Sequence, residues 1–166
     1  MASGLFFDPM VALTAAPLVS STCTLLFAWD QHFFLSLLNT RQVREHSRPM
    51  LPSYFKNFFY KGLPMVLGFL TVTTSTSITN LLAQRTRLIA RRSGWWYVAG
   101  ASLALSHLAF APFIAPKIQA VIEASSEDDT NKILDEWLSI NMVRSLTVDL
   151  GAWLALTVAV VKTLRT

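Results

Sequence analysis

Four long apolar runs constrain this chain more than any other feature. The runs cover about residues 10–38, 58–82, 95–114 and 130–161. A helix of about 20 apolar residues, rising about 1.5 Å per residue, crosses a hydrocarbon core roughly 30 Å thick. Each run is long enough to do so. The sequence therefore predicts an all-α fold, an integral membrane four-helix bundle, in which residues 1–166 form a single four-span transmembrane domain.

The composition agrees with a lipid environment. Only 14% of the 166 residues are charged and 52% are apolar, whereas a soluble domain has about 25% charged residues. The net charge of +4 comes from short basic loops. No aromatic-interleaved basic stripe or recognition helix accompanies it, so no nucleic acid partner is expected. Cys23 is the only cysteine, which excludes an intrachain disulfide and a two-cysteine redox centre.

The flanks of the runs suggest an orientation in the bilayer. No Lys or Arg precedes the first apolar run, so we expect that run to be a retained helix rather than a cleaved signal peptide. Basic residues in short loops set the orientation of membrane proteins, but their totals on the two sides are too close to decide. The four arginines within residues 85–92 and the acidic loop 123–129 favour both termini in the cytosol.

Prolines and aromatic residues indicate where the runs begin and end. Pro49 and Pro52 are expected to break the helix between the first two runs. Pro112 and Pro116 are expected to close the third run. Aromatic residues 95–97 at the start of that run are typical of the belt that lies at a membrane interface.

Four ionisable residues lie in or beside the apolar runs, namely Asp30, His107, Arg144 and Asp149. A charge in hydrocarbon costs several kcal/mol, so such residues face a bundle interior or a wet cavity and suggest a functional site. Asp149 follows Arg144 by five residues, roughly 140° around an α-helix. The two are therefore not expected to pair within the helix. Asp149 needs a partner from another run, or burial keeps it protonated.

The fourth run carries the sharpest pattern. Trp137, Asn141, Arg144 and Val148 follow a 4-3-4 spacing and stack on one helical face. Arg144 offers a fork of donors, Asn141 an amide, and Trp137 a flat apolar wall with one N–H. This set suits a planar, oxygen-bearing ligand on which negative charge is stabilised. The alternative is that Arg144 extends to the lipid headgroups while Trp137 lies in the interface.

His107, deep in the third run, is the best general-base candidate, since a neutral imidazole can take a proton near neutral pH. The alternative is a hydrogen bond to a serine or threonine across the bundle. No other His or carboxylate stands at metal-ligand spacing beside it, so no metal site is expected. Further substrate-binding candidates are Trp29, Asp30, His32 and Trp153. For Asp30 and His32 the alternative is an interfacial hydrogen-bonded pair.

The C-terminal half resembles a known family. Residues 111–119 read Ala-Pro-Phe-Ile-Ala-Pro-Lys-Ile-Gln, an acidic loop follows, and residues 137–144 read Trp-Leu-Ser-Ile-Asn-Met-Val-Arg. This pattern resembles the anthrone oxygenase-like family of small four-span integral membrane proteins. The first half agrees with that family only in span count and loop lengths, and residues 29–34 do not align with it.

The resemblance implies a cofactor-free oxygenase of polyketide secondary metabolism that acts on polycyclic phenols, such as an anthrone oxidised to an anthraquinone. It implies that Trp137, Asn141 and Arg144 line the site, that the partner is a hydrophobic aromatic small molecule, and that the lipid bilayer is that of the endoplasmic reticulum. A homo-oligomer is compatible with this reading.

The residues fit such chemistry. The CH₂ of an anthrone is acidic because its anion is an aromatic phenolate. A base, His107 first and then a carboxylate such as Asp149, would remove the proton, and Arg144 and Asn141 would stabilise the oxyanion. The carbanion would then reduce O₂ without a flavin or a metal. Two alternatives stay open at this point: a non-oxidative membrane cyclase or isomerase, and a non-enzymatic bundle that binds a lipid or a partner.

Overall fold

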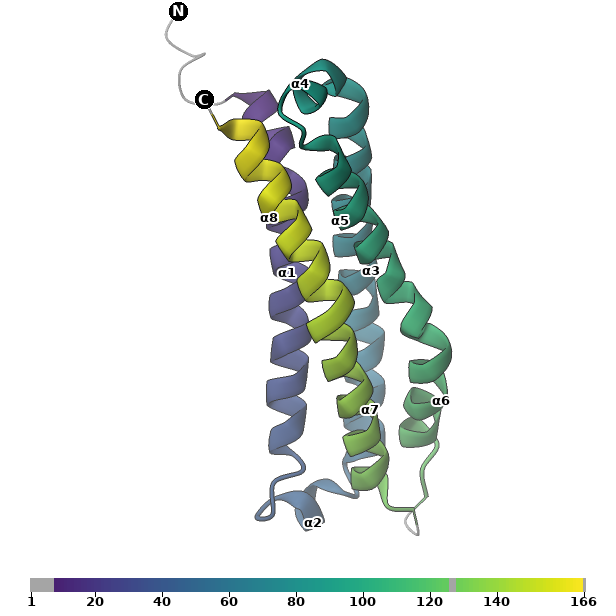
Figure 1. Ribbon diagram of the computed structural model, residues 1–166. Helices are drawn as coiled ribbons and strands as arrows, with labels where there is room; N and C mark the ends of the chain where they lie inside the picture. Colours follow the sequence, from purple (N-terminus) through teal and green to yellow (C-terminus); the bar gives the residue numbers. More distant parts are fainter. Residues whose placement is uncertain (1–7, 126–127, 166) are drawn as a thin grey trace, which may run out of the picture.

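The computed structural model describes residues 8–125 and 128–165, in which every element is helical (Figure 1). These residues contain four stretches that are long and apolar enough to cross a membrane. The prediction of an all-α, four-span bundle is therefore confirmed. The elements are α1 (Pro9–Leu37), α2 (Arg44–Ser47), α3 (Leu51–Ala83), α4 (Arg85–Ala90), α5 (Gly94–Ser106), the 3₁₀ turn η1 (His107–Phe110), α6 (Ala111–Ile122), α7 (Thr130–Arg144), the π turn η2 (Ser145–Asp149) and α8 (Leu150–Leu164).

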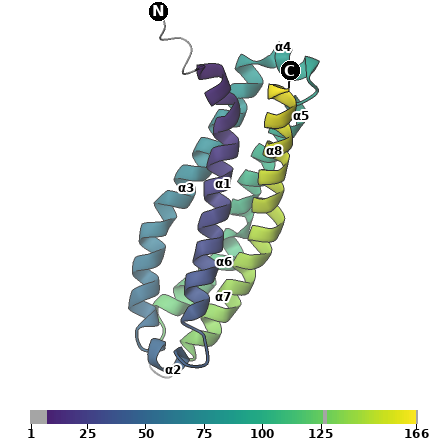
Figure 2. The same ribbon diagram turned by 90° about the vertical axis from the view of Figure 1, so that its left-hand side faces the viewer.

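The four stretches close into a ring. Helix α1 packs between α3 and α8 (Figure 2), and α5 packs against the same two helices. The start of α1, the end of α8 and the short helix α4 lie at one end of the bundle, whereas α2 lies at the other. Helix α6 packs against α3 and α7 at that second end. A polar group on the inner side of any stretch is thus enclosed by the others.

Helix starts follow ordinary capping chemistry. The Asp8 side chain accepts a 2.8 Å hydrogen bond from the Met10 amide at the start of α1, which satisfies a donor that has no partner within the helix. Prolines occupy the first turns of α3 and α6, as Pro52 and Pro112. That position needs no amide donor, so proline is tolerated there.

Two expectations about helix ends are therefore wrong. Pro52 does not break a helix, because α3 begins at Leu51, well before the expected start near residue 58. The third stretch does not close at Pro112. It passes through η1 into α6, with Pro116 inside that helix, and ends at Ile122.

The third stretch begins with aromatic residues of two kinds. Trp95 and Trp96 are exposed, as the predicted interfacial belt requires. Tyr97 is instead fully buried, and its hydroxyl donates to the Thr14 carbonyl at 3.2 Å. The three residues are adjacent, and each step along a helix turns about 100°, so one of the three faces the core.

Candidate functional site

The two irregular turns, η1 and η2, each adjoin a buried ionisable group. Arg144 immediately precedes η2, and Asp149 is its last residue. Arg144 Nε donates to Asp149 Oδ2 at 3.2 Å. The expectation that these residues would not pair within their helix is therefore wrong. It assumed α-helical geometry, whereas a π turn bonds residues five apart and brings positions 144 and 149 onto one face.

His107, the first residue of η1, supplies a second partner for the same carboxylate. Its Nδ1 lies 2.8 Å from Asp149 Oδ1. The expectation that Asp149 takes a partner from another run is confirmed, and the partner of His107 is a carboxylate rather than a serine or threonine. His107, Arg144 and Asp149 are only 8%, 6% and 3% exposed. Both carboxylate oxygens are thus compensated, as burial of such a group requires.

The contact with Asp149 bears on the roles of the imidazole nitrogens. An ionised carboxylate only accepts hydrogen bonds, so a neutral ring paired with an ionised Asp149 would present Nδ1–H to it. Nε2 is then the nitrogen that can accept a proton. In a Ser-His-Asp triad the aspartate likewise accepts a hydrogen bond from Nδ1–H, and Nε2 acts as the base. Arg144 places a delocalised positive charge beside the imidazole.

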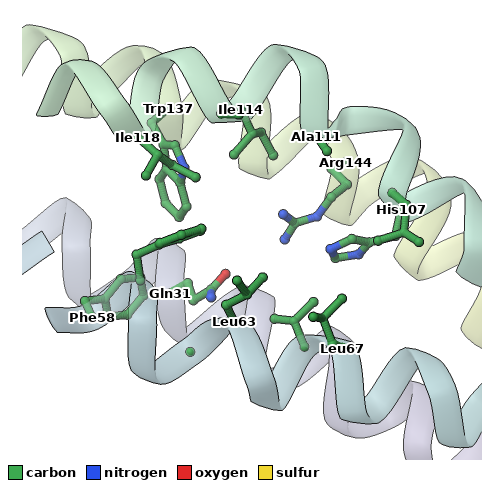
Figure 3. Close-up of a pocket in the computed structure, with 15 residues that line it drawn as sticks. Gln31, Phe58, Leu63, Leu67, His107, Ala111, Ile114, Ile118, Trp137 and Arg144 are labelled. Atoms are coloured by element: carbon green, nitrogen blue, oxygen red, sulfur yellow. The ribbon is translucent and has the colours of Figure 1, made fainter. Parts of the chain in front are cut away.

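An apolar pocket adjoins this cluster (Figure 3). Its cavity volume is about 170 Å³, enough for an aromatic ring, since a cavity of about 150 Å³ admits benzene. Leu63, Leu67 and Leu108 line it and are also exposed on the outer surface. The pocket therefore opens sideways between α3 and η1, toward the side that faces lipid in a membrane. Its polar lining consists of Gln31, His107, Trp137 and Arg144.

Two residues of the predicted 4-3-4 face line this pocket. Trp137 is 3% exposed, and its indole packs edge-on against Phe55 with the ring centroids 5.3 Å apart. Arg144 points into the same space (Figure 3). Their burial inside the bundle opposes the alternative in which Arg144 reaches the headgroups and Trp137 lies in the interface.

The other two residues of that face do not line the pocket. Asn141 is fully buried, but its amide nitrogen donates to the Ala28 carbonyl of α1 at 3.3 Å. Helix α1 covers this part of the face, so the expected position of Asn141 beside Arg144 in the pocket is not observed. Val148 lies within the π turn, which rotates it off the α-helical stripe.

The candidates on α1 lie elsewhere. Trp29 and Asp30 are exposed. Trp29 and His32 line a separate apolar groove between α1 and η2. The alternative of a hydrogen-bonded pair between Asp30 and His32 is not observed in the described residues, where His32 Nδ1 is buried without a partner. These three residues are thus placed outside the pocket that contains His107 and Arg144.

Gln31 is the residue of α1 that sequence reasoning missed. It is 8% exposed and points into the pocket (Figure 3). One signal was available: Thr24, Ala28, Gln31 and Leu35 are all buried and follow a 4-3-4 spacing, which indicates the inner face of the helix. Asp30, the residue predicted from its charge, lies one position earlier and is on the exposed side of the helix.

Trp153 has a structural role instead of lining the pocket. Its indole Nε1 donates to Thr22 Oγ1 at 2.9 Å and so joins α8 to α1. The described part of the chain holds no group of three or more His, Cys, Asp or Glu side chains placed to bind a metal ion. The cofactor-free and metal-free character of the site stays a prediction.

Comparison with known proteins reveals relatives that match over most of their length. The chain is 28% identical to "Epoxidase gkaX" of Penicillium citrinum over 149 residues, which cover 90% of this chain and 92% of that protein. It is 24% identical to "Epoxidase pydX" of an Acremonium species over 156 residues, 94% and 96% of the two chains. It is 28% identical to "Probable epoxidase scpX" of Mollisia scopiformis over 153 residues, 92% and 96% of the two chains.

No protein-family model and no solved structure matches this chain. The similarity is therefore to proteins named as oxidising enzymes, and it extends over nearly the whole length of each. The resemblance to the anthrone oxygenase-like family is compatible with these names, although none of them states it.

Proposed function

We propose that this protein is a membrane-embedded oxidative tailoring enzyme that activates an electron-rich polycyclic phenol for direct reaction with O₂. The observation that carries the proposal is the buried Asp149 carboxylate, shared between His107 and Arg144 beside an apolar pocket. Such a cluster supplies a proton acceptor and a fixed positive charge to a substrate from which water is largely excluded.

The substrate enters from the bilayer through the side lined by Leu63, Leu67 and Leu108. His107 Nε2 takes the acidic proton of the bound ring. The guanidinium of Arg144 stabilises the oxyanion that forms, and Asp149 stabilises the imidazolium. A charge held in a dry site is stabilised more strongly by fixed donors than it is in water.

The activated anion then reduces O₂. For an anthrone, one oxygen atom enters the ring carbon as a carbonyl and the other leaves as water, so anthrone and O₂ give anthraquinone and H₂O. All the electrons come from the substrate. The protein residues hold the anion, receive its proton and return a proton to the departing oxygen.

The same first step also leads to an epoxide, which is relevant because the relatives are named epoxidases. A hydroquinone that loses a proton becomes an electron-rich oxyanion. Its reaction with O₂ gives a quinone epoxide and H₂O, again with one oxygen atom retained and one released as water. An epoxidase and an anthrone oxygenase would thus share the base and the oxyanion-stabilising cation, and would differ in the substrate.

The test is oxygen uptake by the purified, detergent-solubilised protein with a simple anthrone and, separately, a substituted hydroquinone. In ¹⁸O₂ the product should gain one labelled atom. His107→Ala and Arg144→Ala should each lower the rate by about 100-fold or more. The matched controls are His46→Ala, at an exposed position of α2, and Arg91→Ala, in the exposed turn after α4. Both should retain the wild-type rate, as should Trp96→Phe.

Three results would contradict the proposal. Uptake no faster than the uncatalysed reaction would reject the proposed oxygenase activity. Full activity in both the His107 and the Arg144 variants would reject the mechanism. Conversion of a substrate without O₂ consumption, still dependent on His107, would establish the cyclase or isomerase alternative, which uses the same base.

A further inference from the structure

The pocket contains polar groups that the proposed chemistry does not use. The indole Nε1 of Trp137 is buried and has no hydrogen-bond partner in the described residues. By contrast, the indole Nε1 of Trp153, later in the same stretch, donates to Thr22. A buried donor without a partner is costly, so an unpaired N–H in the wall of a pocket points to a ligand acceptor.

Gln31 is a second polar group that lines this pocket. Among the described residues, the other buried side-chain amides each donate a hydrogen bond; these are Asn80, Gln84, Asn131 and Asn141. Within residues 8–125 and 128–165 the structure shows no hydrogen bond to the Gln31 amide, which is only 8% exposed and points into the pocket from α1 (Figure 3). Its amide can donate to or accept from a ligand oxygen.

Packing holds Trp137 in place. Its ring meets Phe55 edge-on and belongs to the core cluster that includes Leu134 and Leu138. The N–H therefore cannot rotate away to find a partner without disturbing that core. Trp137 and Arg144 are seven residues apart on α7, which corresponds to two turns, or about 10 Å along the helix. Figure 3 shows Trp137 and His107 at opposite ends of the pocket.

We propose that Gln31 and Trp137 recognise a second oxygen of the substrate, at the end of a fused-ring system remote from His107. The ligand class is a planar polycycle with one phenol or carbonyl oxygen at the reacting end and another at the opposite end. The identity of the reacting end rests on the proposed function. The recognition of the second oxygen rests on the unpaired Trp137 N–H and on the Gln31 amide that lines the same pocket.

A binding measurement without turnover tests this proposal. The probes are 2,6-dihydroxynaphthalene, which has oxygens at both ends, and 2-naphthol, which lacks one of them. Binding to the detergent-solubilised protein is followed by naphthalene fluorescence, with protein-free micelles as the blank. The wild-type protein should prefer the dihydroxy probe. Gln31→Leu and Trp137→Phe should each reduce that preference about 3- to 10-fold, and affinity for 2-naphthol should change little.

The controls separate a lost ligand contact from a damaged fold. Trp153→Phe loses its hydrogen bond to Thr22, so it should lower thermal stability and keep the preference. Gln42→Leu changes an exposed loop residue and should change neither property. Circular dichroism checks that every variant remains helical.

The outcomes also distinguish this inference from the proposed function. A preference that persists in both the Gln31 and the Trp137 variants would overturn the inference, as would a wild-type protein with no preference. If the variants lose the preference and the wild-type protein consumes no O₂, the second contact is supported and the proposed oxygenase activity is rejected. If the wild-type protein consumes O₂ and both variants keep the preference, the proposed function is supported and the second contact is rejected.

Discussion

Replacement of Asp149 by asparagine is the most informative single change. It preserves the size of the side chain but removes the charge shared by His107 and Arg144. Arg144 is only 6% exposed, so it would become a buried charge without a counter-ion. Removing one partner of a buried ion pair costs about 3–5 kcal/mol. An asparagine oxygen can still accept one hydrogen bond. We therefore expect Asp149→Asn to lower the free energy of unfolding by about 3 kcal/mol, near the lower end of that range.

The same variant should lose activity for a separate reason. The asparagine amide can donate to His107 Nδ1, which would move the ring proton to Nε2 and remove the base. In a Ser-His-Asp triad the equivalent change lowers kcat by about 10⁴. We expect a loss of about 10²–10⁴ in oxygen uptake with an anthrone.

A double variant separates the two effects. With Arg144→Met added to Asp149→Asn, no unpaired charge remains, and stability should return to within about 1 kcal/mol of the wild type. Activity should stay low. Thermal unfolding in detergent is followed by circular dichroism, where 3 kcal/mol corresponds to a Tm lower by roughly 6–12 °C. If the single and double variants unfold at the same temperature, Arg144 and Asp149 are not energetically coupled and the reasoning is refuted.

Two further predictions concern the bundle itself. A Cβ added at Gly100 would lie 2.5 Å from Leu156 Cγ, so Gly100→Ala should cost about 1–3 kcal/mol of the free energy of unfolding through overpacking. Gly68→Ala, where nothing lies within 4 Å, should be neutral or stabilising, and equal losses in the two variants would contradict the α5–α8 contact. Trp153→Phe and Thr22→Val should each cost about 0.5–1.5 kcal/mol, and the double variant little more than one of them. Strict additivity in a double-mutant cycle would show that the hydrogen bond is absent.

Much of the fold could be predicted because the length of each apolar run is visible in the sequence, without knowledge of tertiary contacts. The four spans and the need for partners around Asp149 both follow from the cost of polar groups in hydrocarbon. The boundaries were less accurate because a proline can end a helix or occupy its first turn. At Pro52 and Pro112 only the geometry distinguishes these two cases.

The candidate site was predicted in part. His107, Trp137 and Arg144 were chosen from sequence, and all three line one pocket. The pairing of Arg144 with Asp149 was missed because hydrophobic periodicity carries no signal for a single π turn. Gln31 was missed because a change of one position along α1 turns a side chain by about 100°, which exchanges an exposed Asp30 for a buried glutamine.

The sequence by itself thus determined that this protein is a bundle of four membrane-spanning helices whose few buried charges must be compensated. Length and hydropathy impose that result whichever way the helices face. Only the tertiary structure decided which polar groups meet. The 3₁₀ turn at His107 and the π turn before Leu150 set the rotation and register of two stretches. Contacts such as His107–Asp149 form only at one such register, because hydrogen bonds act over about 3 Å.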